Sequence, residues 1–341
     1  MNATRLLSRY RSALMGLAQL WVVLLHCWLL IIPNRPLLGA IENFVKFNGI
    51  LGVEMFLFLS GLSMTYAIRK GSLRSFYLSR LRRVLVPYWV MAALYATLAG
   101  QGLRWFMLYA SGVGLITQNF QGHLWFIPAI IILYAFFPAY HALMMRAKDK
   151  SAFTLAALML WLCTVILMRD IIREDLWVFV NRIPAFLLGV WFGETGREKA
   201  LTLHAEHWTL LALCVPAGLL LRSAGSVGLV QLIPQFSFAA AWLCGVPLCF
   251  LLAGLFAWLE DGKAGRIFRW PLRFLSFVGT FTLELYGCHQ LVFTSLYPLL
   301  EGRISYLGIN LVVIPAAVFA GWLFHVLHMA LWKLVSKAPR M

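Results

Sequence analysis

Charged residues are scarce in this sequence. Only 12% of its 341 residues are charged, 62% are hydrophobic, and the mean hydropathy is +0.81. About a quarter of the residues in soluble domains are charged, so the composition excludes a water-soluble globular protein. Apolar runs of membrane-spanning length follow one another with short polar pieces between them, which leaves no room for a sizeable soluble domain. We therefore expect a single membrane domain over residues 1–341.

Acidic residues and patterned cysteines are also few. The chain has 13 Asp and Glu against 29 Lys and Arg, a net charge of +16. The basic residues cluster at the ends of apolar runs, which predicts membrane lipids and not nucleic acid as partners. The six cysteines lie inside apolar runs without the paired spacing of metal ligands, so we expect neither disulfides nor a metal. These are Cys27, Cys163, Cys214, Cys244, Cys249 and Cys288.

Ten apolar runs have the length of membrane spans. They are 13–32, 48–68, 84–100, 122–143, 152–168, 176–193, 207–221, 236–259, 274–298 and 306–332. Basic loops face the cytoplasm, and the loop at 146–150 does so only if the short apolar run 103–117 does not cross. The sequence thus predicts an all-α, polytopic membrane bundle of about ten helices with both termini cytoplasmic. The run 103–117 would be re-entrant or interfacial.

No cleavage signature follows the basic N-terminus, so the first apolar run is expected to be an uncleaved span. No internal repeat is visible either, which disfavours a repeat-built transporter.

Five ionisable side chains fall near the outer ends of these runs. Such a group costs a few kcal/mol inside a membrane, so it usually faces a partner or a cavity. Counted from the span ends, His26 and Glu54 share a depth, and His123, Arg182 and His289 lie on the same side. A base, a carboxylate and cations for an oxyanion are the groups that acyl transfer needs. A buried network of structural ion pairs is the alternative, because depth alone does not separate the two.

Two further groups of polar residues lie in the last spans. Glu284 and His289 project from different faces of one helix, so each needs its own partner. His325 and His328 have one-turn spacing that would suit a metal, but interfacial histidines are ordinary at the end of a terminal helix. We favour the interfacial interpretation.

Arginines crowd the entry to the third span. Arg80, Arg82 and Arg83 precede Pro87 there. Such a group suits a multiply phosphorylated ligand through bidentate contacts, and it equally suits lipid phosphates and the topology signal. The interior histidines favour the phosphate-bearing ligand.

An ordered series of motifs resembles the acyltransferase 3 family. The series comprises Gly16 to His26, Gly52 to Gly61, Phe76 to Arg80 with Arg83 and Pro87-Tyr88-Trp89, His123 to Ile127 with Tyr134 and Pro138, Arg182 to Phe186 with Gly189 and Gly193, and Leu283 to His289. The resemblance covers nearly the whole chain. It implies transfer of an acyl group, usually acetyl from acetyl-coenzyme A as co-substrate, to a carbohydrate hydroxyl such as that of lipopolysaccharide, exopolysaccharide or a lipid-linked oligosaccharide. It further implies a multi-pass protein of the bacterial cytoplasmic (inner) membrane, with His26 central to catalysis.

The chain departs from the family pattern in two ways. The family places an arginine where this chain has Met15, and Arg11 lies one helical turn earlier, about 22 Å from His26 and about 60° around the helix. We also expect no part of residues 1–341 to form the fused extracytoplasmic hydrolase-like domain that some members have. The membrane domain therefore either suffices or works with a separate periplasmic partner.

These residues predict a mechanism. Acyl-coenzyme A would bind from the cytoplasm with its phosphates on Arg80, Arg82 and Arg83, joined by the displaced Arg11, and its pantetheine arm would reach His26. His26 would act as general base on the acceptor hydroxyl or would carry the acyl group itself.

The remaining polar residues would support His26. Glu54 would orient it, and Arg182 or His123 would stabilise the oxyanion. One rival function is a transporter or flippase of a lipid-linked saccharide, in which the same polar groups line a path. Another is a membrane sensor or scaffold with a purely structural polar core.

Overall fold

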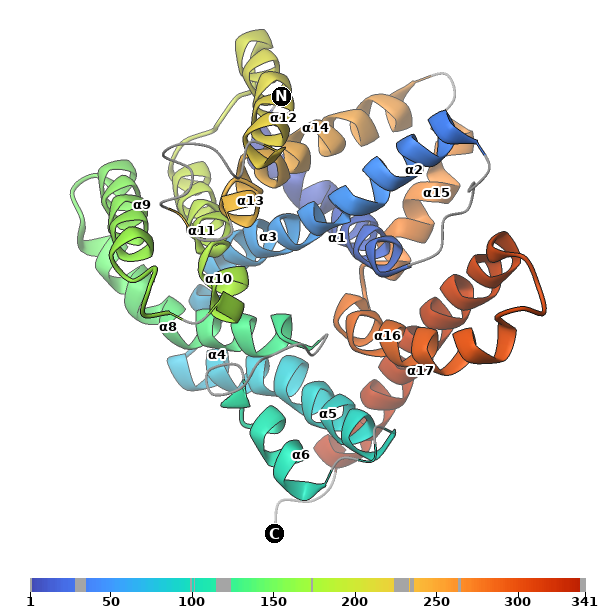
Figure 1. Cartoon of the computed structure of the whole chain (residues 1–341). Coiled ribbons are helices and arrows are strands. Elements are labelled where there is room, and N and C mark those ends of the chain that lie inside the picture. The colour runs from blue at the N-terminus through green and yellow to red at the C-terminus, as the bar shows by residue number, and fades with distance from the viewer. Residues whose placement is uncertain are drawn as a thin grey trace.

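The protein is a bundle of helices (Figure 1), seen in a computed structural model that describes residues 2–27, 35–98, 100, 102–114, 124–172, 174–223, 233, 236–262 and 265–337. It is 87% helical, and the described residues contain no strand, which confirms the expected all-α class. The first half contains α1 (Ala3–His26), α2 (Pro36–Phe47), α3 (Leu51–Ala67), α4 (Leu73–Arg80), a π-helix (Leu81–Leu85), α5 (Val86–Leu98), α6 (Leu103–Ala110) and α8 (Phe126–Arg146). The second half contains α9 (Lys150–Leu167), α10 (Glu174–Val180), α11 (Ile183–Glu198), α12 (Ala205–Ser223), α13 (Phe236–Ala239), α14 (Trp242–Asp261), α15 (Gly265–Val278), α16 (Thr282–Leu300) and α17 (Tyr306–Lys337).

Six helical stretches in the described part of the chain are long and apolar enough to cross a membrane, so this is a multi-pass membrane protein. They are Pro36–Lys70, Phe126–Arg146, Lys150–Leu167, Leu176–Glu198, Trp242–Asp261 and Tyr306–Leu334. The count of ten spans and the cytoplasmic placement of both termini stay predictions. Helix α6 has eight residues, or about 12 Å, which is too short to cross a bilayer.

Helices α1 and α3 occupy the centre of the bundle, with the α16–α17 pair on one side and α8 and α9 on the other (Figure 1). Helix α3 packs on α11 through two glycines. A Cβ at Gly61 would lie 2.2 Å from the carbonyl oxygen of Phe186, and one at Gly189 would lie 2.1 Å from that of Phe58. Because glycine lets the backbones touch, small residues favour such close contacts between membrane helices. The α3–α11 seam therefore has no room for a larger side chain.

The expected single span 274–298 is wrong, because the chain leaves the helix at residues 279–281 and α15 and α16 are separate. Thr280 donates its hydroxyl to the carbonyl oxygen of Phe277 (2.7 Å), a local bond that competes with the helix ladder. Gly279 reaches the backbone of α1 at the same point, where an added Cβ would lie 2.0 Å from the carbonyl oxygen of Ser12. The chain then runs along α1 as α16.

Helix α1 begins ten residues before the expected span 13–32. Asn2 caps it by accepting a hydrogen bond from the backbone N–H of Arg5 (2.9 Å). The helix ends at His26, and residues 28–34 lie outside the described part of the chain. His26 is thus the last residue of α1, whereas the sequence predicted a helix that continues six residues beyond it.

Candidate functional site

Two histidines meet at the end of α1. The Nε2 atom of His289, from α16, lies 3.2 Å from Nδ1 of His26, and the ring centroids are 4.9 Å apart. His289 is fully buried, and His26 is partly buried. The sequence predicted both residues for the site but did not predict that they pair.

Backbone carbonyls fix the tautomers of the two rings. Nδ1 of His289 lies 3.2 Å from the carbonyl oxygen of Leu285, and Nδ1 of His26 lies 2.8 Å from that of Val22. A carbonyl oxygen only accepts, so we assign the proton to Nδ1 in each ring. The Nδ1–H of His26 then also faces the lone pair of His289 Nε2. The basic nitrogen of His26 is therefore Nε2.

Glu54 does not orient His26, contrary to the expectation from the sequence. Helix α3 runs antiparallel to α1, and its Gly52 packs against Ala18, where a Cβ would lie 2.5 Å from the carbonyl oxygen. Glu54 lies two residues beyond Gly52 in the direction away from His26, so it is about 15 Å from His26 along α1. It also projects about 200° around α3 from the glycine that touches α1. The shared depth was wrong because the helix ends do not fall where the apolar runs end.

Glu54 pairs instead with Arg182, at the break between α10 and α11. Arg182 Nε donates to Glu54 Oε1 (2.9 Å), and both side chains are at most 1% exposed. The guanidinium carbon lies 4.8 Å from the ring of Trp125 and 5.0 Å from that of Phe238. Within the described ranges, Arg182 Nη1 and Glu54 Oε2 have no hydrogen-bond partner. The pair thus links α3, α8, α11 and α13 on the side of α3 away from α1.

Three arginines, Arg11 of α1, Arg80 of α4 and Arg83 of the π-helix, lie within electrostatic reach of one another, about 22 Å along α1 from the histidines. Burial lowers the pKa of Arg11 below its usual value, and the positive charges of Arg83 and Arg80 lower it further. Burial and the charge of Arg83 lower the pKa of Arg80 in the same way. Tyr134 lies among these arginines, with its ring 5.9 Å from the guanidinium carbon of Arg80. A group of like charges this close is unfavourable unless an anion joins it, so the geometry fits a phosphate site.

Arg11 belongs to this cluster although it is displaced from the family position. Its Nε donates to the hydroxyl of Ser63 (2.6 Å), which fixes the guanidinium between α1 and α3. Arg82 lies apart, with its guanidinium carbon 4.5 Å from the ring of Trp332 on α17. Arg83 falls in a π-helical turn, a feature that is frequent at functional sites. His123, the remaining predicted site residue, lies outside the described residues.

Two buried glutamines escaped the sequence reasoning. Gln19 on α1 and Gln290 on α16 are each 1% exposed, and the Nε2 atom of each has no hydrogen-bond partner among the described residues. Gln290 follows His289 directly and lies one helical turn after Tyr286, whose ring contacts that of Phe126 at 5.5 Å. Buried amide donors usually find partners. Both glutamines lie inside apolar runs of the sequence, and this position could have identified them.

Glu284 is held by the last helix. Its Oε1 lies 2.8 Å from Nδ1 of His325 and 3.6 Å from Nδ1 of His328. Glu284 and His289 therefore have separate partners, as their different faces predicted. The two histidines tie α17 to α16.

A second polar cluster was also missed. Glu194 of α11 is 1% exposed, and its two oxygens lie 2.9 Å from Nε2 of His141 and 2.6 Å from Nη2 of Arg69. His141 and Glu194 are ionisable groups inside or at the edge of apolar runs, so the rule that singled out His26 applied to them as well. The cluster joins α8, α11 and the end of α3.

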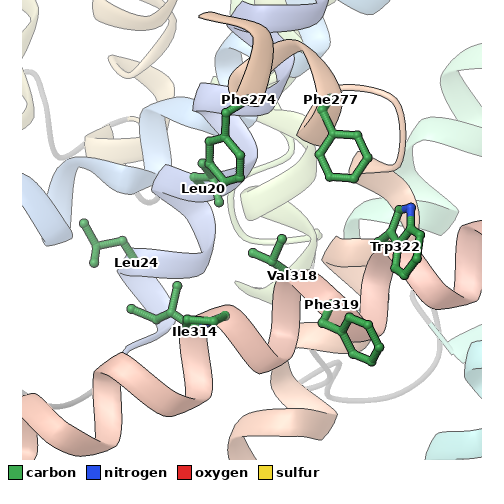
Figure 2. A pocket seen from close by; sticks show the side chains of 9 residues that line it. Leu20, Leu24, Phe274, Phe277, Ile314, Val318, Phe319 and Trp322 are labelled. Atoms are coloured by element: carbon green, nitrogen blue, oxygen red, sulfur yellow. The ribbon is translucent and has the colours of Figure 1, made fainter. Parts of the chain in front are cut away.

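An apolar groove of about 670 Å³ lies between α1, α15 and α17 (Figure 2). Leu24 lines it and projects about 160° around α1 from His26. Its lining comprises Leu20, Leu24, Phe274, Phe277, Ile314, Pro315, Val318, Phe319 and Trp322. Such a surface offers nothing to a phosphate or a sugar hydroxyl, so the groove is separate from the polar site.

Comparison with known proteins agrees with the motifs. The family model of acyltransferase 3, described as an acyltransferase domain, matches residues 13–326. No curated protein and no solved structure matches the chain. The match includes the histidine pair, the Glu54–Arg182 pair, and Arg80 and Arg83. The chain belongs to the acyltransferase 3 family and is a membrane acyltransferase.

Proposed function

We propose that this protein transfers an acyl group, acetyl in the simplest case, from acyl-coenzyme A to a hydroxyl of a surface or lipid-linked carbohydrate in the bacterial inner membrane. The supporting observation is that one helix, α1, carries both an arginine of the cluster assigned to the donor phosphates and the histidine assigned to catalysis. The arginine cluster, which has no acidic partner among the described residues, lies around Arg11 in the first half of α1, and the histidine pair lies at its end, fifteen residues or about 22 Å away. A donor with phosphates at one end and a thioester at the other suits this arrangement.

The arginine cluster would hold the phosphates of the donor. Arg11, Arg80 and Arg83 lie within electrostatic reach of one another. Arg82, which stacks on Trp332, would add a contact at the edge. In this proposal the donor enters from the cytoplasm, and the separation of the two sites lets the acceptor approach His26 from the other side.

His26 would act as general base through Nε2. The acceptor oxygen attacks the thioester carbonyl carbon as its proton passes to His26. Collapse of the tetrahedral adduct breaks the carbon–sulfur bond, and the proton moves from His26 to the coenzyme A thiolate. His289 stabilises the transient imidazolium, because its Nε2 faces the Nδ1–H of His26 at 3.2 Å. An acyl group held on His26 Nε2 is the alternative route and would appear as labelled enzyme when acceptor is withheld.

Gln290 replaces Arg182 as the proposed oxyanion donor. Its buried amide follows His289 and has no partner on Nε2. Arg182 is engaged by Glu54 on the far side of α3 from α1, which suits a positioning pair better than contact with the reacting atoms. His123, which lies outside the described residues, keeps its candidate role from the sequence.

The test is transfer of label from radioactive acetyl-coenzyme A to envelope glycolipid by the purified protein. We expect transfer by the wild type and by His207→Ala, a matched control at a half-exposed histidine. His26→Ala should lower the rate at least about 1,000-fold with the protein still present in the membrane. Full activity of His26→Ala would overturn the mechanism, and a transporter of lipid-linked saccharide predicts no label transfer by any variant.

A further inference from the structure

Gln19 is a polar side chain without an evident structural purpose. It lies in the middle of α1 and is 1% exposed, and its Nε2 has no hydrogen-bond partner in the part of the chain that the structure describes. A buried donor left unpaired lowers the stability of the fold. A ligand that accepts a hydrogen bond from Gln19 would explain why such a residue stands in an apolar run.

The packing of α1 shows where Gln19 points. Ala18 touches α3 at Gly52, and Gly16 touches α15 at Leu275. Gln19 projects between these two contacts and lies about 20° around the helix from His26, because seven residues make almost two full turns. Since His26 meets α16 on that side, Gln19 faces the interior between α3 and α16.

Gln19 lies between His26 and Arg11 along α1, at a distance that matches the pantetheine arm of coenzyme A. Gln19 lies about 10 Å along α1 from His26 and about 12 Å from Arg11. The pantetheine arm of coenzyme A contains two amides, which follow one another along the chain that leads away from the sulfur. With ordinary bond lengths, the carbonyl carbon of the second amide lies about 11 Å from the thioester carbon in an extended arm. A donor that places its thioester at His26 thus brings its second amide to Gln19.

We propose that Gln19 binds the pantetheine arm, with its Nε2–H donating to the carbonyl oxygen of the second amide. This assignment rests on the proposed function, since it needs an acyl-coenzyme A donor. It makes Gln19 a donor-binding residue that sets how far the thioester travels along α1. The contact is absent for any thioester that ends before the second amide.

A comparison of two thioester donors, with and without the second amide, measures the contribution of this contact. S-acetylpantetheine carries both amides, whereas S-acetyl-N-acetylcysteamine carries only the first. For the variant Gln19→Leu we expect kcat/KM with S-acetylpantetheine to fall roughly three- to tenfold, the effect of one lost hydrogen bond. With the truncated donor it should change less than about twofold. Met15→Leu, one turn earlier on α1, is the control and should leave both values unchanged.

Thermal stability separates binding from a structural role. Because Gln19→Leu removes an unpaired buried amide, its Tm without ligand should equal or exceed that of the wild type. The rise in Tm on adding pantetheine should be smaller than in the wild type. Equal losses with both donors, or a lower Tm without ligand, would overturn the assignment of Gln19 alone. No transfer by the wild type from either donor or from acetyl-coenzyme A would overturn the proposed function and this assignment together.

Discussion

Replacing His289 by leucine removes the imidazole that faces His26 and leaves the carbonyl of Val22 in place. That carbonyl, 2.8 Å from His26 Nδ1, still holds the tautomer and the ring. The loss is then one hydrogen bond to a ring that becomes positive in the transition state. Hydrogen bonds to charged groups contribute about 1.5–3 kcal/mol, and about 1.4 kcal/mol is tenfold in rate. We expect His289→Leu to lower kcat about 10- to 100-fold.

Steady-state transfer from acetyl-coenzyme A measures this effect. KM for the donor should stay unchanged, because the arginine cluster is untouched. His289→Gln offers an amide oxygen as acceptor and should recover part of the rate. A loss as large as that of His26→Leu would refute the reasoning, because His289 would then be the base. An unchanged kcat in a correctly folded His289→Leu protein would refute it as well.

Three further predictions concern the phosphate site, the ion pair and the packing. Arg80→Gln should raise KM for acetyl-coenzyme A about tenfold and leave KM for S-acetylpantetheine unchanged, because only the first donor carries the nucleotide phosphates; equal effects would place Arg80 elsewhere. Arg182→Met should destabilise the fold by about 3–5 kcal/mol by leaving Glu54 unpaired, and adding Glu54→Leu should restore most of that loss, measured by thermal unfolding in detergent. If the double variant is stable but inactive, the pair has a role in catalysis. Gly61→Ala should sharply lower the yield of folded protein, because its methyl would lie 2.2 Å from the Phe186 carbonyl oxygen; a normal yield would contradict the close packing.

The residues that could be predicted are those whose type alone is informative. An imidazole in an apolar run is costly wherever it stands, so the sequence selected His26 and His289 as candidates without their neighbours, and the structure brings the two rings together. Arg80 and Arg83 were found because the spacing of basic residues along the chain is visible in the sequence. The helical class followed from composition in the same way.

The depth of a side chain in the membrane was predicted less well than its type. It was counted from the ends of apolar runs, but α1 starts at Ala3 and ends at His26, and α3 continues from a helix that begins at Pro36. Hydropathy marks where a segment is apolar, whereas hydrogen bonds and close contacts decide where a helix ends. Glu54 was therefore placed beside His26 when its partner is Arg182. That pairing depends on a break in the helix that no apolar pattern marks.

Neutral polar residues were missed for a different reason. Gln19 and Gln290 carry no charge, and a single glutamine in an apolar run is often satisfied by a neighbour. Only the packed structure shows that both are buried with an unpaired N–H. Which group a side chain pairs with, and whether its hydrogen bonds are satisfied, depend on the three-dimensional packing.

The end of α1 at His26 has an electrical consequence. The peptide dipoles of a helix leave a partial negative charge over its last turn, which stabilises a cation there by about 0.3–1 kcal/mol. The 24 residues of α1 thus aim this field at the ring that takes up the proton. Had the helix run on to residue 32, the imidazole would lie six residues before its end, beyond the last turn in which this field acts. The end of α1 at His26 thereby lowers the energy of the imidazolium form of His26, in addition to the effect of His289.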